Sequence, residues 1–223
     1  AKLFLLFLIQ GICVKNIIIV GSGGLAKDIY PALKSNLKPD EKIKGFLVDD
    51  KSKYTKANFD EPYLGTINEY IIDENDYFLI AFGNNPGRAQ TYQDLKAKGA
   101  KFFTFIHPST LLPKRFYIGD SVLIGAFCII GEDSVIKDNV FINKFVNVGH
   151  DSTIFEHSIL CPYVMISGGC TIGQQNFLAT RSTIAPNIHI GDFCTISAHT
   201  FVKRNICRNK FLYNTSITKS KEK

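Results

Sequence analysis

The sequence predicts two folded parts, a small α/β domain over residues 15–105 and a parallel β-helix over residues 106–204. The β-helix is predicted by a repeat of six residues, because every sixth position from Ile106 to Val202 is Ile, Leu or Val. Neither an α-helix, with its period of 3.6, nor an ordinary strand, with its period of 2, keeps this spacing over such a length. Short strands that wind around a prism and stack coil on coil do keep it, with three repeats to a coil.

The repeat also predicts which side chains fill the prism. The residue four places after each aliphatic position is usually small or β-branched, so we expect both positions to point inward. Glycine often follows the aliphatic residue, as in Ile118-Gly119 and Ile130-Gly131. We interpret these glycines as tight corners that favour a residue without a side chain.

The cysteines indicate a reducing compartment. Cys128, Cys170 and Cys194 take the inward small position, where a free thiol behaves as a small apolar group. The other three cysteines show no metal-ligand spacing. Since disulfides are rare in reducing compartments, we expect a cytoplasmic protein.

The α/β domain begins with a turn suited to anions. Residues 16–20 form a predicted buried strand, a glycine-rich turn follows at residues 21–26, and an amphipathic helix is expected around residues 28–35. Backbone N–H groups at such a turn face the ligand, and the helix dipole favours negative charge. The alternative is a glycine turn that packs a helix on a strand and binds nothing.

Two further predicted strands also end in polar residues. Residues 43–48 lead to Asp49 and Asp50, and residues 77–82 lead to Gly83-Asn84-Asn85, with Arg88 beyond. Open parallel sheets bind ligands at the carboxyl ends of their strands, where an acidic side chain can reach a ribose or sugar hydroxyl. Because only about 90 residues precede the repeats, too few for a complete dinucleotide fold, we expect a mononucleotide or nucleotide-sugar site.

His150 is the strongest catalytic candidate. It lies in Asn147-Val148-Gly149-His150-Asp151, outside the inward positions of the prism and directly before a carboxylate. A neutral imidazole is a natural general base near neutral pH, and a carboxylate partner can orient its tautomer and raise its basicity.

The glycine loop, the Gly83-Asn84-Asn85 turn and His150-Asp151 within the repeat resemble those of a known family. They are similar to the bacterial sugar O- and N-acetyltransferases of the sialic acid O-acetyltransferase type, including enzymes that acetylate nucleotide-linked 4-amino sugars. The resemblance covers roughly residues 15–205. It implies a small Rossmann-like domain that binds a nucleotide sugar, a left-handed β-helix that binds acetyl-CoA as co-substrate, no metal, and a homotrimer with its active site between neighbouring prisms.

The resemblance also implies roles for individual residues. The catalytic pair falls on His150 and Asp151. The substrate contacts fall on the three strand ends, at Gly23, Gly24, Leu25, Asp49, Asp50, Gly83 and Asn84. The acetyl-CoA contacts, counted along the repeat, fall on Ile159, Gly168, Thr180 and Ala198.

The two ends of the chain carry separate expectations. Residues 1–14 are expected to be an extension of uncertain status, in which the apolar run 3–9 is too short to span a bilayer, so no stable membrane insertion is expected. The net charge of +6 lies entirely in residues 203–223, and residues 205–223 form a basic tail. Such a tail either attracts an anionic ligand such as a nucleotide or coenzyme A, or is merely solvated. No nucleic acid partner is expected.

Three alternatives remain open at this point. The acceptor could be a hydroxyl, as in a sialic acid O-acetyltransferase. Leu25 and Ile159 stand where the family usually has histidine, which leaves room for a β-helix scaffold without catalytic activity. A zinc enzyme of the γ-carbonic anhydrase type needs three convergent histidines, which the positions of the five histidines do not favour.

Overall fold

The computed structural model describes residues 14–214, so residues 1–13 of the predicted extension and 215–223 of the predicted tail lie outside the described residues. The described chain forms two compact units. The first comprises the described residues up to Phe82 together with Gln93–Phe103, and the second comprises Gly83–Tyr92 and the residues from Thr104 onward. Residues 83–92, which the sequence places in the α/β domain, therefore pack with the β-helix.

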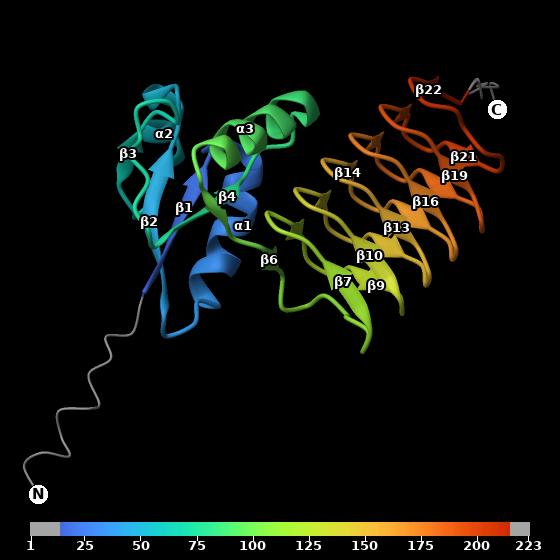
Figure 1. Ribbon diagram of the computed structural model, residues 1–223, viewed down its shortest axis with the longest axis horizontal. Helices are drawn as coiled ribbons and strands as arrows, with labels where there is room; N and C mark the ends of the chain where they lie inside the picture. The colour runs from blue at the N-terminus through green and yellow to red at the C-terminus, as the bar shows by residue number, and fades with distance from the viewer. Residues whose placement is uncertain (1–13, 215–223) are drawn as a thin grey trace, which may run out of the picture. The chain divides into compact units, whose positions relative to one another are not determined.

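The first unit contains a five-stranded parallel sheet of order β3-β2-β1-β4-β5 (Figure 1). Its strands are β1 (Lys15–Val20), β2 (Glu41–Leu47), β3 (Tyr63–Gly65), β4 (Asp76–Ile80) and β5 (Lys101–Phe102). The helices that connect them are α1 (Gly24–Ser35), α2 (Lys51–Ala57) and α3 (Asn85–Ala97). Because β1 and β4 lie inside the sheet, Ile17–Val20 and Phe78–Ile80 are fully buried apolar runs, as expected for inner strands of a parallel sheet.

The second unit is a left-handed parallel β-helix with three faces, and the repeat of six predicted it correctly (Figure 1). The first face holds β7 (Phe116–Ile118), β10 (Ser134–Ile136), β13 (Thr153–Ile154), β16 (Thr171–Ile172) and β19 (His189–Ile190). The second holds β6 (Phe105–Ile106), β8 (Leu123–Ile124), β11 (Phe141–Ile142), β14 (Ile159–Leu160), β17 (Phe177–Leu178), β20 (Thr195–Ile196) and β22 (Phe211–Leu212). The third holds β9 (Ile129–Ile130), β12 (Asn147–Val148), β15 (Met165–Ile166), β18 (Thr183–Ile184) and β21 (Phe201–Val202).

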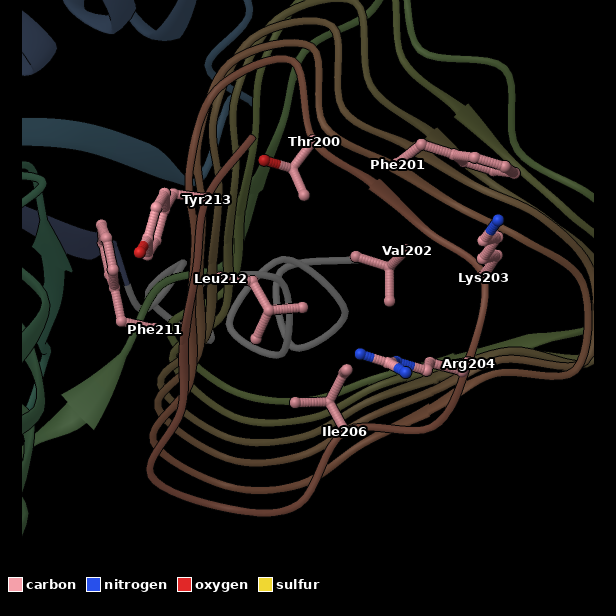
Figure 2. A pocket seen from close by; sticks show the side chains of 9 residues that line it. All are labelled: Thr200, Phe201, Val202, Lys203, Arg204, Ile206, Phe211, Leu212 and Tyr213. Carbon is pink, nitrogen blue, oxygen red and sulfur yellow. The ribbon is translucent and has the colours of Figure 1, made fainter. Parts of the chain in front are cut away.

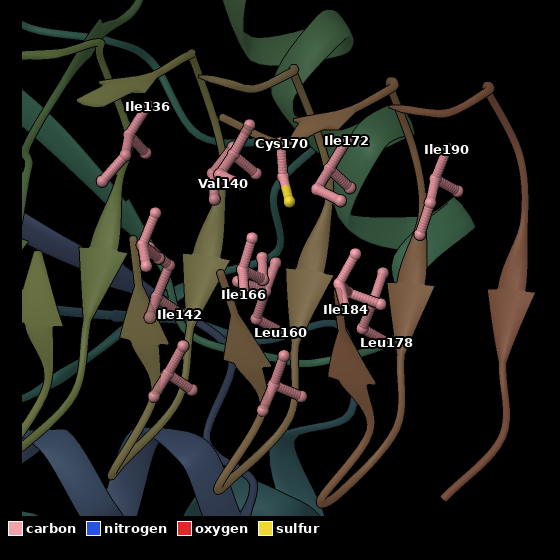
Figure 3. Close-up of a cluster of buried hydrophobic side chains, with 14 of the residues drawn as sticks. Ile136, Val140, Ile142, Leu160, Ile166, Cys170, Ile172, Leu178, Ile184 and Ile190 are labelled. Atoms are coloured by element: carbon pink, nitrogen blue, oxygen red, sulfur yellow. The ribbon is translucent and has the colours of Figure 1, made fainter. Parts of the chain in front are cut away.

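Strands of one face pair in register eighteen residues apart, as Val135 does with Thr153, except that β20 and β22 pair sixteen residues apart. The aliphatic positions of the repeat therefore stack in files inside the prism (Figure 3). Leu112 is an exception: its side chain is 41% exposed, although its place in the repeat predicted an inward position. In this first coil the chain makes only an isolated bridge, between Leu111 and Ile129, instead of a strand, so Leu112 is not held over the core.

The tight corners differ from the prediction in where they fall. The left-handed backbone conformation occurs three residues after the aliphatic position and recurs every six residues, mostly at non-glycine residues such as Phe127, Asp151 and His157. Each costs about 1–2 kcal/mol. Inter-coil hydrogen bonds at the same positions offset this cost, for example from the Asp151 amide to the Glu132 carbonyl at 2.9 Å.

The glycines directly after the aliphatic residues serve another purpose. A Cβ added at Gly131 would collide with the backbone nitrogen of His150 in the next coil. Glycine is thus required there by the close approach of two coils, and its φ is not in the left-handed region. No helix within residues 14–214 is long and apolar enough to cross a membrane.

Candidate active site

His150 lies at the corner between the third and first faces, which we call the third corner. In successive coils, the residues of this corner with left-handed backbone are Asp133, Asp151, Gly169 and Asn187. His150 Nδ1 lies 2.6 Å from Asp151 Oδ2. The two side chains are 70% and 65% exposed, so the pair is open to a ligand from outside the prism. The expected catalytic pair is therefore in hydrogen-bonding contact.

The contact determines which imidazole nitrogen can act as a base. A carboxylate is an acceptor only, so in the neutral ring the proton lies on Nδ1 and the lone pair on Nε2. Nε2 then faces away from Asp151 with its lone pair available. This tautomer is the one that a general base requires.

Gly168 shapes the space around the ring. A Cβ added at residue 168 would lie 2.5 Å from His150 Nε2 and 2.6 Å from Cε1, so the imidazole occupies the space that any side chain there would fill. Position 168 stands one coil after position 150, in the register of eighteen. The ring of His150 thus rests on the glycine backbone.

Acidic groups accumulate at this corner, and the sequence analysis missed them. Asp133 stands one coil before Asp151, and Arg115 binds both its oxygens, Nε to Oδ1 at 2.8 Å and Nη2 to Oδ2 at 2.6 Å. The hydrogen bond from Arg115 lowers the pKa of Asp133. Asp133 and Asp151 are eighteen residues apart, which is the length of one coil, so the sequence spacing alone could have predicted that they stack at this corner.

The glycine loop of the first unit has the features of an anion site. Gly23 caps α1 and Gly24 begins it, and a Cβ on either residue would meet no atom within 4 Å. Ser22 is buried beside them, and its Oγ has no hydrogen-bond partner among the described residues. Leu25 is half-buried in the first turn of α1. The loop leaves open space at the positive end of the helix.

Asp49 and Asp50 follow β2, which pairs with β1, so their carboxylates and the glycine loop belong to the same edge of the sheet. Asp50 caps α2 by accepting hydrogen bonds from the Ser52 amide at 3.0 Å and the Ser52 hydroxyl at 2.7 Å. Asp49 accepts a weaker bond from the Ile67 amide at 3.3 Å. Both carboxylates are exposed and retain capacity to accept from a ligand.

Gly83 and Asn84 belong to the second unit, so the expected substrate residues are divided between the two units. Asn84 Oδ1 accepts a hydrogen bond from the Gly87 amide at 2.8 Å, which caps the start of α3. The nearest atom to a Cβ placed on Gly83 would be Phe141 Cε1 at 3.9 Å, so this glycine is not required by crowding.

The four expected acetyl-CoA residues do not converge within one chain. Gly168 lies at the third corner, whereas Thr180 and Ala198 precede the left-handed residues of the second corner, between the second and third faces. Ile159 lies on the second face and is buried, with 1% of its surface exposed. The structure therefore brings Gly168 to His150 and places the other three elsewhere on the prism.

The third face carries an exposed apolar column that the sequence analysis also missed. Its outward residues stand eighteen apart, and the apolar ones are Leu111, Ile129, Met165 and Phe201. This face connects the second corner to the third. A period of eighteen, read beside the period of six, would have shown it.

A cavity of about 510 Å³ lies at the C-terminal end of the described prism (Figure 2). Val202, Ile206 and Leu212 point into the open end, and Arg204 reaches across it. Among residues 14–214, no group of three or more His, Cys, Asp or Glu side chains is arranged to hold a metal ion.

A parallel α/β unit followed by a left-handed β-helix defines the fold class of several sugar N-acetyltransferases of known structure. The perosamine N-acetyltransferase of Caulobacter crescentus, solved with CoA and GDP-perosamine, aligns with a TM-score of 0.76 and 22% identity over 89% of this chain and 93% of its own. The acetyltransferase domain of PglB from Neisseria gonorrhoeae aligns with a TM-score of 0.73 and 22% identity over 86% and 93% of the two chains.

The sequence comparisons point to particular relatives. Residues 16–95 match the PglD N-terminal domain family. The UDP-N-acetylbacillosamine N-acetyltransferase of Bacillus subtilis is 36% identical over 118 residues, which are 50% of this chain and 52% of the relative. The aligned region thus spans about half the length of this curated relative. These matches confirm the resemblance to bacterial sugar acetyltransferases.

Proposed function

We propose that this protein is an acetyl-CoA-dependent N-acetyltransferase that acts on the amino group of a nucleotide-linked sugar, with His150 as general base. The observation that carries the proposal is the 2.6 Å contact between His150 Nδ1 and Asp151 on an exposed corner of the β-helix. The relatives support the reaction class, since two are named as N-acetyltransferases of UDP-N-acetylbacillosamine and perosamine. The PglB acetyltransferase domain is also solved with acetyl coenzyme A.

In the proposed reaction the acceptor amine attacks the thioester carbonyl carbon while Nε2 of His150 removes its proton. The carbonyl becomes a tetrahedral oxyanion, the carbon–sulfur bond then breaks, and the imidazolium returns the proton to the leaving thiolate of CoA. The Gly168 amide is the candidate donor to the oxyanion, because it takes no part in the inter-coil ladder of the described residues. Asp151 holds the tautomer and stabilises the imidazolium.

We propose that acetyl-CoA binds between two chains of a homotrimer. Gly168 lies at the third corner while Thr180 and Ala198 lie at the second, so a coenzyme held between two prisms could contact the third corner of one and the second corner of the other. The apolar column of the third face, which connects these corners, is suited to packing against a second copy. Ile159 is buried within the single chain, so we assign it no direct contact with the coenzyme.

The nucleotide moiety is assigned to the glycine loop and to Asp49 and Asp50. Open space at Gly23 and Gly24, the positive end of α1 and the Ser22 hydroxyl, which has no partner among residues 14–214, together suit a diphosphate. The free carboxylate capacity of Asp49 and Asp50 suits ribose or sugar hydroxyls. We place the protein in the cytoplasm, where the buried free thiols of Cys128, Cys170 and Cys194 would stay reduced.

The test is an acetyl-CoA consumption assay with a panel of nucleotide 4-amino sugars and free sialic acids. The wild-type protein should acetylate a nucleotide amino sugar, and His150→Ala should lower kcat by about 10²–10⁴-fold because the general base is lost. His189→Ala, which removes an exposed histidine of β19, is the matched control and should keep full activity. A folded His150→Ala variant with wild-type turnover would exclude the mechanism.

Two other outcomes of this experiment define the alternatives. Turnover of sialic acid instead of nucleotide amino sugars would make the protein an O-acetyltransferase. No turnover, together with no CoA binding in calorimetry, would make the β-helix a scaffold.

A further inference from the structure

Helix α3 presents a buried polar face to the β-helix. Asn85, Arg88 and Tyr92 are spaced by three and four residues, so they share one side of the helix. Arg88 is fully buried, and Tyr92 and Asn85 are 3% and 9% exposed. All three belong to the same compact unit as the coils that they contact. We call these three residues the α3 clamp.

The clamp donates to the corner between the first and second faces. Asn85 Nδ2 donates to the Gln175 and Asn176 carbonyls at 3.0 and 3.1 Å. Arg88 donates from Nη2 to the Ser121 carbonyl at 3.1 Å and from Nε to the Asn139 carbonyl at 3.3 Å.

Ser121, Asn139 and Gln175 are left-handed corner residues, and their carbonyls accept nothing from the inter-coil ladder of the described residues. The clamp therefore supplies hydrogen-bond donors to buried carbonyls that the inter-coil ladder leaves without a donor.

Burying a guanidinium costs free energy, because the charge is removed from water. Burial lowers the pKa of Arg88 to about 9, so the side chain remains a cation at neutral pH. Its charge lies 5.8 Å from the centre of the Phe141 ring, inside the unit. Since an apolar side chain of similar volume usually packs at lower cost, the value of Arg88 lies in the fixed direction of its hydrogen bonds.

Those hydrogen bonds hold the first turn of α3, and the Gly83-Asn84 turn lies directly before it. The Arg88 amide donates to the Asn84 carbonyl at 2.8 Å, and the Gly87 amide donates to Asn84 Oδ1 at 2.8 Å. The turn is thus tied to α3, and α3 is tied to the β-helix at residues 85 and 88.

We propose that Arg88 and Asn85 are positioning residues for the sugar substrate, which they serve by holding the Gly83-Asn84 turn against the β-helix. The inference rests on the proposed function and on the expectation from the sequence that Gly83 and Asn84 contact the nucleotide sugar. Tyr92, at the far end of the clamp, donates its hydroxyl to Asp138 Oδ2 at 2.9 Å and is about two helical turns from Asn84. It belongs to the same buried face without touching the turn.

The experiment compares Arg88→Met, Asn85→Ala and Tyr92→Phe by steady-state kinetics and thermal unfolding. With the nucleotide amino sugar that the wild type turns over, the first two variants should raise KM for the sugar by about 10-fold, as expected when a positioned contact is lost, and leave KM for acetyl-CoA within about 2-fold. Tyr92→Phe should lower Tm and leave both KM values unchanged. Arg88→Lys keeps the positive charge but has fewer hydrogen-bond donors than arginine. Its KM for the sugar should therefore lie between those of the wild type and Arg88→Met.

A purely structural clamp predicts a different pattern, in which loss of Tm is accompanied by less active enzyme while both KM values stay at the wild-type level in all variants. That result would overturn the proposal. If Arg88→Met does not fold, Asn85→Ala carries the same test with only two hydrogen bonds removed.

Hydrogen exchange separates this inference from the proposed function. The amides of Gly87 and Arg88 should exchange at least about 10-fold faster in Arg88→Met or Asn85→Ala, while amides in the core of the β-helix stay protected. This readout needs no substrate, so it decides whether the clamp holds the turn even if the wild type acetylates none of the sugars tested. Unchanged exchange in both variants would overturn the inference.

Discussion

At the scale of single residues, the proposed chemistry depends on how the imidazole of His150 is held between Asp151 and Gly168. The ring is held on one side by the Asp151 carboxylate, 2.6 Å from Nδ1, and on the other by a backbone without a side chain. A group that is 70% exposed is normally free to rotate, and here two neighbours restrict it. The proposed base therefore depends on a glycine eighteen residues away as much as on the acid next to it.

Gly168→Ala should lower kcat by about 10²-fold or more, because the new methyl group displaces the imidazole from Asp151 and most of the general-base contribution is lost. The measurement is kcat of the folded variant at saturating acetyl-CoA. Gly173→Ala is the matched control: its Cβ would lie 2.5 Å from Asp192 Oδ1, so it crowds the same β-helix away from His150. The control should lose stability and keep its turnover, whereas wild-type kcat in Gly168→Ala would contradict the role of the glycine.

At the scale of elements, β4 begins with a buried carboxylate that connects neighbouring elements at the amino-terminal end of this strand. Asp76 accepts hydrogen bonds from the Lys44 ammonium, the Tyr70 hydroxyl and the Asp73 amide, each at 2.9 Å. Burial opposes ionisation of Asp76, but these donors outweigh it and lower the pKa of the carboxyl. Strand β4 is thereby joined to β2 and to the loop that precedes β4.

Asp76→Asn should lower the free energy of unfolding by about 2–3 kcal/mol at pH 7, since a charged acceptor with several donors is lost. A carboxyl with a lowered pKa in the folded state contributes stability that is present above its unfolded pKa of about 3.9 and is lost as the pH falls through the folded value. The difference between wild type and variant should therefore shrink below about pH 4. Denaturant titrations at pH 7 and pH 3.5 would measure it.

Asp73→Asn is the control for this prediction. Asp73 is 69% exposed and contacts Lys44 at 2.7 Å, so its loss should cost less than about 1 kcal/mol. A difference for Asp76→Asn that stays constant down to pH 3 would exclude the electrostatic explanation.

At the scale of the whole molecule, the third face of the β-helix is the surface on which the proposed trimer depends. Its outward column includes Met165, 50% exposed, and Phe201, 61% exposed, with no covering element among the described residues of the second unit. The column also holds Asn147 and Thr183 between the apolar side chains, and its outward positions recur every eighteen residues, which suits a partner with the same repeat.

Met165→Lys should convert the trimer to monomers, because a charge would be buried in each contact between chains. Light scattering should show the mass fall from three chains to one. Thr171→Lys places the same charge on the first face of the same coil and should leave the mass unchanged. A wild-type protein that is monomeric and fully active would contradict the proposed site between chains.

Much of the fold followed from the spacing of apolar residues alone. A β-helix repeats one local geometry, so a period of six in the chain becomes a file of stacked side chains, and Ile136, Ile154 and Ile172 are all fully buried as predicted. The catalytic candidate was also found from its neighbours, since His150 and Asp151 are adjacent in the chain. Leu112 breaks the pattern because the first coil has no complete strand there to hold it inward.

Other features depend on residues that are distant in the chain and meet only when the coils stack. The left-handed corners carry Phe, Tyr and Arg as readily as Asn, because inter-coil hydrogen bonds and ring stacking, such as that of Phe145 on Tyr163 at 4.8 Å, impose the conformation. The partnership of Arg88 with the Ser121 and Asn139 carbonyls spans more than thirty residues and has no periodic signal. Periodicity reports which side of the chain faces inward, whereas the surroundings of His150 and Arg88 arise from contacts between separate coils and a helix, and only the folded chain decides these.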